Sequence, residues 1–130
     1  LESSLIQACD IAIIPINKIN ELKPGIRKSL LAEHSLALNH GKSPNKLIMA
    51  LRNGIPTLCS RIPSYEALAK EADLDLCCGS TSEWVEKTSR LKQSLERRKE
   101  FSQKGLSFIE EKYSHQNFIN QWDNVFESLK

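Results

Sequence analysis

Residues Gly41 to Pro56 read GKSPNKLIMALRNGIP and contain the clearest signals for a helix in this sequence. Ser43 is a favourable N-cap residue, and Pro44 suits the first helical position because its φ is preset and it lacks an N–H group. An apolar stripe follows at helical spacing, formed by Leu47, Ile48, Ala50 and Leu51. Beyond it, Gly54 commonly closes a helix in the left-handed region, and Pro56 cannot continue one. The stretch therefore predicts a helix of about three turns that starts at Ser43.

The first turn of this helix carries Lys42, Asn45 and Lys46. A helix start presents unpaired N–H groups and the positive end of the macrodipole, so two ammonium groups and an amide beside it favour an anion such as a phosphate or diphosphate. Lysine in the first turn is repelled by the positive end of the helix dipole unless an anion binds there. This local conflict favours an anion-binding site. The alternative is that both lysines are only solvated side chains.

Apolar runs on either side of this helix predict the strands of a parallel sheet. Residues 10–16 (DIAIIPI) form a nearly continuous apolar run, which suits a strand buried on both faces. Two shorter runs, 55–60 and 74–78, predict two further strands. Helices are expected over residues 1–9, after Gly25, over 63–72, from a capping box at Ser80 and Glu83, over 96–112 with a break near Gly105, and over 114–129.

This order of elements predicts an α/β fold, a Rossmann-like parallel sheet with flanking helices. Residues 1–130 are interpreted as a single domain with a helical tail from about residue 80 onward. In such sheets ligands lie outside the carboxyl ends of the strands, which is where segment 17–46 is expected. Because three strands make a small sheet and the chain does not begin with Met, we expect an incomplete domain from a longer polypeptide.

Composition narrows the classes of function. The 130 residues are 40% hydrophobic and 26% charged, which is ordinary for a soluble globular domain. A net charge of +2 is too balanced to indicate nucleic acid or an anionic membrane surface as a partner. No apolar run approaches the ~20 residues of a membrane-spanning helix, and the first residues lack the pattern of a secretion signal.

The cysteines and the last helix carry weaker signals. Cys9, Cys59, Cys77 and Cys78 include no C-x-x-C pair and have no His at zinc-ligand spacing, so we interpret them as small buried apolar residues and expect no metal. The helix over 114–129 has an apolar stripe that is interpreted as packing, formed by Phe118, Ile119, Trp122, Val125, Phe126 and Leu129.

Other side chains have two interpretations each. His34 and His40 flank the expected site, but we interpret them as helix-face or loop residues. Trp84 and Trp122 suit core packing, with a partner interface as the alternative. The charged run 97–99 is interpreted as a solvated helix face.

Two segments, CDIAIIPI (9–16) and KSPNKLIMALRNGIPTLCSRIPSYEAL (42–68), together with a carboxyl-terminal helix that contains a Trp, resemble a known family. The chain is similar to the carboxyl-terminal nucleotide-sugar-binding domain of GT-B glycosyltransferases. The resemblance is closest to bacterial members with a K-S-x-N-[KR] motif followed by G-[IL]-P-[TV] and P-S-Y. It covers about residues 1–129 and is most specific over 42–65.

The resemblance implies a set of residues that hold the donor. Those expected against the diphosphate are Gly41, Lys42, Ser43, Asn45 and Lys46, and further possible donor contacts are Asn17, Met49 and Tyr65. Positive charge there would stabilise the leaving nucleoside diphosphate as the sugar–phosphate bond breaks. The family transfers sugar without a bound metal, so we expect neither metal nor cofactor. Terminal helices in a complete enzyme pass back toward the acceptor domain.

The sequence also departs from the family pattern. Many retaining members carry two Glu residues eight positions apart, where this chain has Gly41 and Met49. The contact to the ribose hydroxyl must therefore come from another residue or be missing, and no catalytic residue is assigned. The acceptor domain of the family is not in this chain. We therefore do not expect the chain alone to catalyse glycosyl transfer.

These observations lead to an expected function and two alternatives. The expected function is the donor-binding part of a glycosyltransferase that uses a nucleoside diphosphate sugar in bacterial surface polysaccharide synthesis, in the cytoplasm or at the inner face of the membrane. An acceptor glycan or lipid would bind through the missing amino-terminal domain. The alternatives are a non-catalytic nucleotide- or phosphate-binding module, favoured by Met49, and a helical protein-interaction domain that would expose Trp84 and Trp122.

Overall fold

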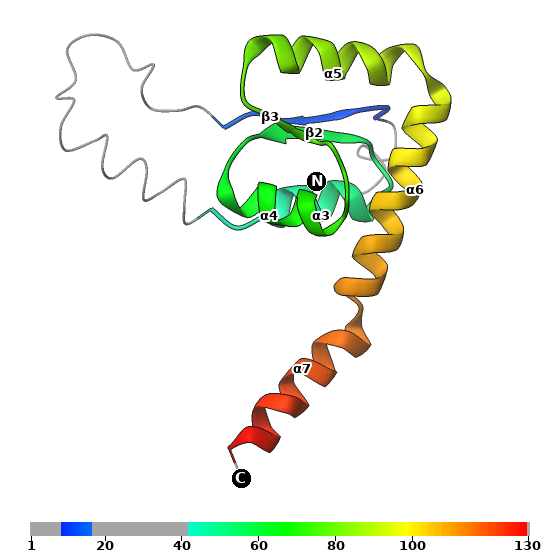
Figure 1. Cartoon of the computed structure of the whole chain (residues 1–130). Coiled ribbons are helices and arrows are strands. Elements are labelled where there is room, and N and C mark those ends of the chain that lie inside the picture. Colours follow the sequence, from blue (N-terminus) through cyan, green and yellow to red (C-terminus); the bar gives the residue numbers. More distant parts are fainter. Residues whose placement is uncertain (1–8, 17–41, 130) are drawn as a thin grey trace, which may run out of the picture.

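The computed structural model of the chain describes residues 9–16 and 42–129. In chain order its elements are β1 (Ala12–Ile14), α3 (Asn45–Arg52), β2 (Thr57–Ser60), α4 (Pro63–Glu71), β3 (Cys77–Cys78), α5 (Thr81–Gln93), α6 (Leu95–Lys112) and α7 (His115–Ser128). The strands form one parallel sheet in the order β1-β2-β3 (Figure 1). The described part is therefore α/β, a small parallel sheet with flanking helices that is compatible with a Rossmann-like arrangement.

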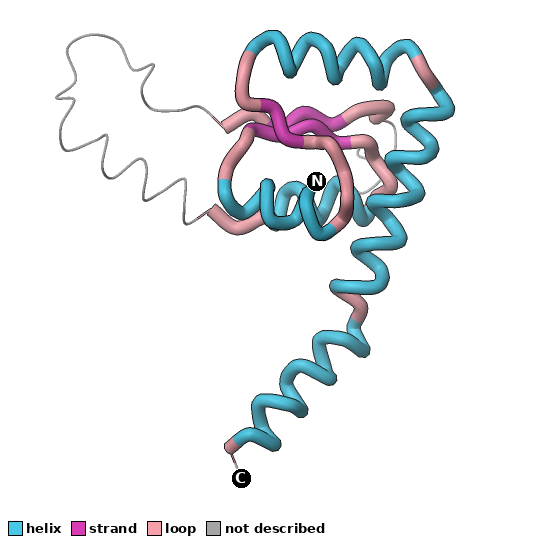
Figure 2. The backbone as a smooth tube through the Cα atoms, in the orientation of Figure 1, coloured by secondary structure: helices cyan, strands magenta, loops and turns pink. Residues whose placement is uncertain are grey.

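The sheet lies between two layers of helices, with α5 on one face and α3 and α4 on the other (Figure 2). Ala12 of β1 pairs with Thr57 of β2, and Cys59 of β2 pairs with Cys77 of β3. Because parallel strands need crossover connections, the chain returns along α3 before it enters β2 and along α4 before it enters β3. The helices α3, α4 and α5 therefore all begin at the edge where the strands end, which we call the carboxyl edge (Figure 1).

The core forms two clusters on the two sides of the sheet. The larger one joins residues of β2, β3, α3, α4 and α6, and its buried members are Leu47, Leu51, Cys59, Ile62, Tyr65, Leu68, Ala69, Ala72, Leu74, Leu76, Cys77 and Ile109. The smaller one consists of Leu58, Cys78 and Leu91, with Trp84 packed against it. The packing interpretation of Trp84 is therefore confirmed.

Three of the four cysteines, Cys59, Cys77 and Cys78, are buried, as expected. Cys59, Cys77 and Cys78 lie within the strands, where small apolar side chains fit between the sheet and its helices. The prediction is wrong for Cys9, which is exposed because it precedes β1 and lies outside the layers.

Two glycines shape the contact between α3 and α6. Gly54 follows the end of α3 with φ 67°, as the sequence predicts for a residue that closes a helix. The expected break near Gly105 is wrong, because α6 continues through this position. Gly105 is buried, and a Cβ atom placed on it would lie 2.9 Å from Cδ2 of Leu51. The glycine therefore allows the two helices to pack closely rather than ending one of them.

Serine side chains cap the last three helices. Ser80 accepts a hydrogen bond from the Glu83 N–H at 3.2 Å, and the Glu83 carboxylate accepts one from the Gly79 N–H at 2.5 Å, so the expected capping box is confirmed. Ser94 and Ser114 cap α6 and α7 in the same way.

The charged run 97–99 is only in part a solvated face. Arg98 is half-buried and donates hydrogen bonds to the carbonyl groups of Leu91 at 2.7 Å and Lys92 at 3.0 Å. Those carbonyls belong to the last turn of α5, which has no further turn of its own to satisfy them. The interpretation is therefore wrong for Arg98, which ties the end of α5 to α6.

The last helix, α7, projects away from the sheet (Figure 1). Its apolar stripe was expected to pack, and this is wrong, because the side chains of Phe118, Ile119, Trp122, Val125, Phe126 and Leu129 are 37–77% exposed. The rings of Phe118, Trp122 and Phe126 contact one another along the helix. Helical spacing predicts that the apolar residues share one face of the helix. It does not predict whether another part of the chain packs against that face.

No helix in the described ranges combines the length and the apolar character needed to cross a membrane.

Candidate anion site at the carboxyl edge

The candidate site lies where α3 begins, at the carboxyl edge of the sheet (Figure 1). Leu47 is fully buried, Leu51 is 1% exposed, and Ile48 packs against the larger core cluster, which fixes α3 against the sheet. The polar residues Lys42, Ser43, Asn45 and Lys46 are all exposed. The packed apolar side of the helix therefore leaves the polar residues of its first turn open to solvent.

The structure corrects the expected start of this helix. Its N-cap is Pro44, not Ser43, and no side chain caps it. The first intrahelical hydrogen bond runs from the Ile48 N–H to the Pro44 carbonyl at 2.9 Å. Proline has no side-chain acceptor and Ser43 lies one residue too early, so within residues 9–16 and 42–129 no side chain caps the first N–H groups of α3.

The electrostatics of this helix start are unbalanced. The first turn of α3 contains no acidic residue, while Lys46 lies in it and Lys42 precedes it. The positive end of the macrodipole therefore has one lysine in its turn and another just before it, and no carboxylate from the same turn. This combination suits an anionic ligand such as a phosphate group.

The two other helix starts at this edge differ from that of α3. Ser80 and Glu83 occupy the start of α5, and the hydrogen bond from the Gly79 N–H is the main reason why the pKa of Glu83 lies below its usual range, with Arg61 adding to it. The start of α4 has no side-chain cap but has Glu66 in its first turn. Both of these helices therefore carry a carboxylate of their own near their positive ends.

Sequence reasoning missed Ser60 and Arg61, which follow β2 directly. Ser60 Oγ accepts a hydrogen bond from the Ile16 N–H at 2.7 Å and so joins the ends of β1 and β2. Arg61 lies between two carboxylates, 3.7 Å from Glu66 and 3.2 Å from Glu83. Their position in the sequence could have identified them, because polar residues directly after a buried strand lie at the carboxyl edge of the sheet.

Of the remaining expected site residues, the structure describes Met49 and Tyr65. Met49 is 52% exposed and lies one turn further along α3, so its side chain is open to solvent. Tyr65 is 2% exposed and belongs to the core, where burial raises the pKa of its hydroxyl group. Gly41 and Asn17 lie outside the described residues, as do His34 and His40.

Within the described ranges, no group of three or more His, Cys, Asp and Glu side chains is arranged to hold a metal ion.

The chain matches no protein-family model, no curated protein and no solved structure.

Proposed function

We propose that the chain is the donor-binding part of a GT-B-type glycosyltransferase, and that the start of α3 binds the diphosphate of a nucleoside diphosphate sugar. The observation that carries the proposal is the uncapped start of α3 with Lys42 and Lys46 exposed beside it. Two phosphate groups would accept hydrogen bonds from the free N–H groups and would neutralise the ammonium groups. The motif K-S-P-N-K agrees with this role.

The same charges would assist glycosyl transfer. Cleavage of the sugar–phosphate bond leaves negative charge on the departing diphosphate, so cations and a helix dipole fixed beside it stabilise the transition state more than the ground state. We propose no catalytic residue, since the chemistry would also require an acceptor-binding domain. The acceptor would be a glycan or lipid of bacterial surface polysaccharide synthesis, in the cytoplasm or at the inner face of the membrane.

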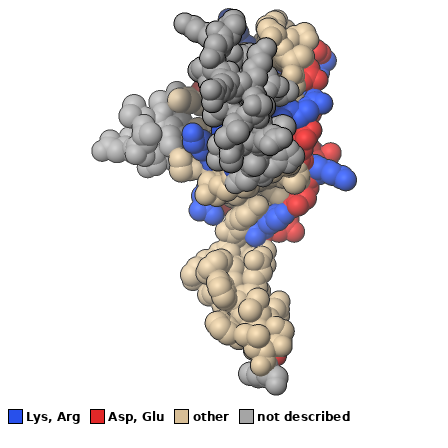
Figure 3. Space-filling model, turned by 90° about the vertical axis from the view of Figure 1, so that its left-hand side faces the viewer, with Lys and Arg blue, Asp and Glu red and all other residues tan. Residues whose placement is uncertain are grey.

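The exposed stripe of α7 fits a chain that functions together with a further domain. The terminal helices of the resembled family pass back toward the acceptor domain, and such a helix would keep an apolar face uncovered in the carboxyl-terminal part alone. Figure 3 shows that the side of α7 turned to the viewer is almost free of charged side chains, in contrast to the body above it. Burial of this stripe against a second domain would therefore require little desolvation of charge.

Two other functions remain as alternatives, each with one observation in its favour. A non-catalytic nucleotide- or phosphate-binding module is favoured by Met49, which leaves α3 without the family's second Glu. A helical protein-interaction domain is favoured by the exposure of Trp122 on α7. The first alternative shares the anion site, whereas the second does not need it.

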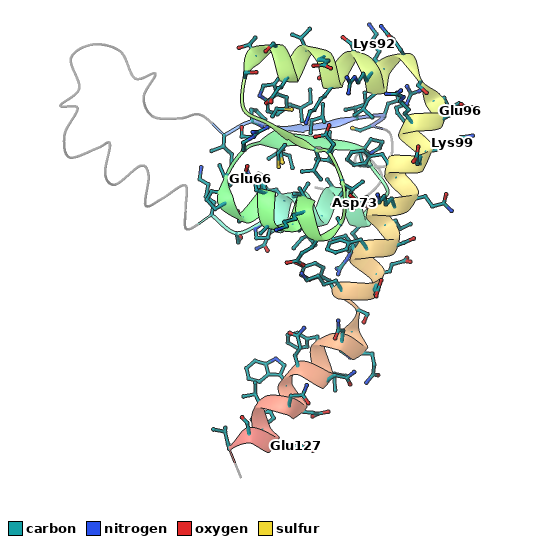
Figure 4. The ribbon with its side chains drawn as sticks, in the orientation of Figure 1. Glu66, Asp73, Lys92, Glu96, Lys99 and Glu127 are labelled. Atoms are coloured by element: carbon teal, nitrogen blue, oxygen red, sulfur yellow. The ribbon has the colours of Figure 1, made fainter. Side chains whose placement is uncertain are left out.

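The direct test is calorimetric titration of the chain with UDP, GDP and inorganic phosphate at low and moderate salt. We expect a nucleoside diphosphate to bind more tightly than phosphate, with an affinity that falls as salt rises. The double variant K42A/K46A should lose at least tenfold in affinity and much of the salt dependence. The matched control is K92A/K99A, which removes two exposed lysines near the α5–α6 turn, on the other side of Figure 4 from the start of α3.

The outcomes separate the functions. Equal affinity of wild type and K42A/K46A, with or without an effect of K92A/K99A, would contradict the proposed diphosphate site. Absence of any nucleoside diphosphate binding would favour the helical interaction domain. Binding of diphosphates without discrimination among nucleoside diphosphate sugars, and without transfer when an acceptor domain is supplied, would favour the non-catalytic module.

A further inference from the structure

A surface groove of about 620 Å³ runs beside β3, the outer strand of the described sheet. Charged side chains border it, and two of them, Glu66 and Asp73, are labelled in Figure 4 at the two ends of α4. Cys77 forms part of its wall and is 8% exposed. The groove therefore gives solvent a narrow route to one thiol of the sheet.

A second thiol lies directly behind the first. Cys59 is 0% exposed and is the register partner of Cys77 in the parallel β2–β3 pair, and the two Sγ atoms are 3.8 Å apart. Neighbouring strands lie about 4.8 Å apart, which is within the Cα separations of about 4.4–6.8 Å that a disulfide spans. The Sγ atoms would need to approach by about 1.8 Å to bond, a movement that side-chain rotation supplies.

The two thiols are not equivalent. The hydrogen bond with Cys59 lowers the pKa of Cys77, and the charges of Lys87 and Arg61 act in the same direction, against burial and the Glu66 carboxylate, which raise it. The same hydrogen bond, together with burial, raises the pKa of Cys59. Cys77 is thus the more accessible of the two thiols and the one with the lower pKa, so it forms the reactive thiolate more readily.

We propose that Cys77 and Cys59 form a reversible dithiol–disulfide site that reacts with low-molecular-mass disulfides entering through the groove. The Cys77 thiolate attacks one sulfur of the small disulfide, forms a mixed disulfide and releases the first small thiolate. Cys59 then attacks the Cys77 sulfur and expels the second small thiolate, which takes up the Cys59 proton and leaves as a thiol. In total, one small disulfide is reduced to two thiols while two protein thiols become one disulfide.

The cross-link would stabilise the sheet around α4. Cys59 and Cys77 are 18 residues apart, and the whole of α4 lies in the loop that the bond would close. Closing a loop of this size restricts the unfolded chain, and we expect the midpoint of thermal unfolding to rise by on the order of 10 °C. The site would thereby couple the redox state of small thiols to the stability of the domain.

The test uses the full chain with Cys9→Ser, so that an exposed thiol does not form links between molecules. The protein is incubated with glutathione disulfide, digested with trypsin and mapped by mass spectrometry. We expect a linked pair of peptides, 53–61 with 71–87, a higher unfolding midpoint, and reversal of both by dithiothreitol. The second peptide also contains Cys78, so C78S should keep the link and C77S should abolish it.

The contradicting results are specific. A link that persists in C77S would show that Cys78 forms the bond. A Cys59 thiol that stays unmodified after prolonged exposure to the small disulfide, with Cys77 present, would contradict the dithiol–disulfide site. If C77S does not fold, C59S serves instead, since it should stop at a stable mixed disulfide on Cys77. A C59S protein that takes up no glutathione would contradict the route through the groove.

Discussion

The substitution Gly105→Ala tests the close contact between α3 and α6. The new Cβ would lie 2.9 Å from Cδ2 of Leu51 and 3.6 Å from Cδ1 of Leu74. Carbon atoms prefer separations of about 3.5–4.0 Å, so Leu51, which is 1% exposed, would have to move by at least ~0.6 Å in a packed core. Overpacking of this kind costs about 1–3 kcal/mol.

A second contribution has the opposite sign. Alanine is better than glycine in a helix interior by about 1 kcal/mol, so the net effect of Gly105→Ala should be a loss of roughly 1 kcal/mol in the free energy of unfolding. Urea denaturation measures this change. The exposed Ser107 on the same helix offers a control, because the difference between S107A and S107G reports the helix contribution without the contact.

A double-mutant cycle makes the argument sharper. Leu51→Ala removes the clashing group and should cost about 2–5 kcal/mol, and in that background Gly105→Ala should become neutral or stabilising. The coupling between the two sites should therefore be at least ~1 kcal/mol. A stabilisation of about 1 kcal/mol by Gly105→Ala in the wild type, as at an exposed site, would refute the close packing of α3 on α6.

Three further predictions concern helix ends, pH and the exposed helix. Ser80→Ala should lower the free energy of unfolding by about 1 kcal/mol, whereas Ser43→Ala should change it by less than ~0.5 kcal/mol because Ser43 caps no helix; urea denaturation of both variants checks this. The hydrogen bond from the Gly79 N–H lowers the pKa of Glu83, so the ionised Glu83 carboxylate stabilises the folded state. This stabilisation is fully present above the ordinary pKa of 4.5 and is lost as pH falls through the lower pKa of the folded state. Unfolding midpoints between neutral and acid pH should therefore fall less steeply in Glu83→Gln, and parallel curves would contradict the assignment. Trp122→Ala should cost less than ~1 kcal/mol because half of this side chain is exposed, and a loss of about 3–5 kcal/mol would show that it packs as a core residue.

Local chemistry made much of the sheet predictable. The apolar runs at 10–16, 55–60 and 74–78 each contain an observed strand, and glycine at position 54 adopts the positive φ that was expected after α3. Strand ends were less predictable, because an apolar residue such as Leu74 is buried beside the ladder without belonging to it. An apolar run predicts that its residues are buried, but it does not predict which of them form hydrogen bonds between strands.

The sequence-based predictions were wrong where contacts between distant parts of the chain determine the role of a residue. Gly105 was expected to break a helix, but the approach of Leu51 from another helix gives it a packing role that no local pattern contains. The stripe on α7 was expected to be covered, although periodicity identifies only a face and not its neighbour. Arg61 was missed because its pairing with Glu83 of α5 joins residues that are distant in sequence.

An NMR titration of the isotope-labelled chain with UDP, with the backbone amide signals assigned, tests whether the start of α3 binds a diphosphate. We expect the largest chemical-shift changes at Asn45, Lys46 and Leu47, while residues 92–99 at the α5–α6 turn remain unchanged. Binding that shifts the signals of residues 92–99 and leaves those three amides unchanged would contradict a diphosphate site at the start of α3.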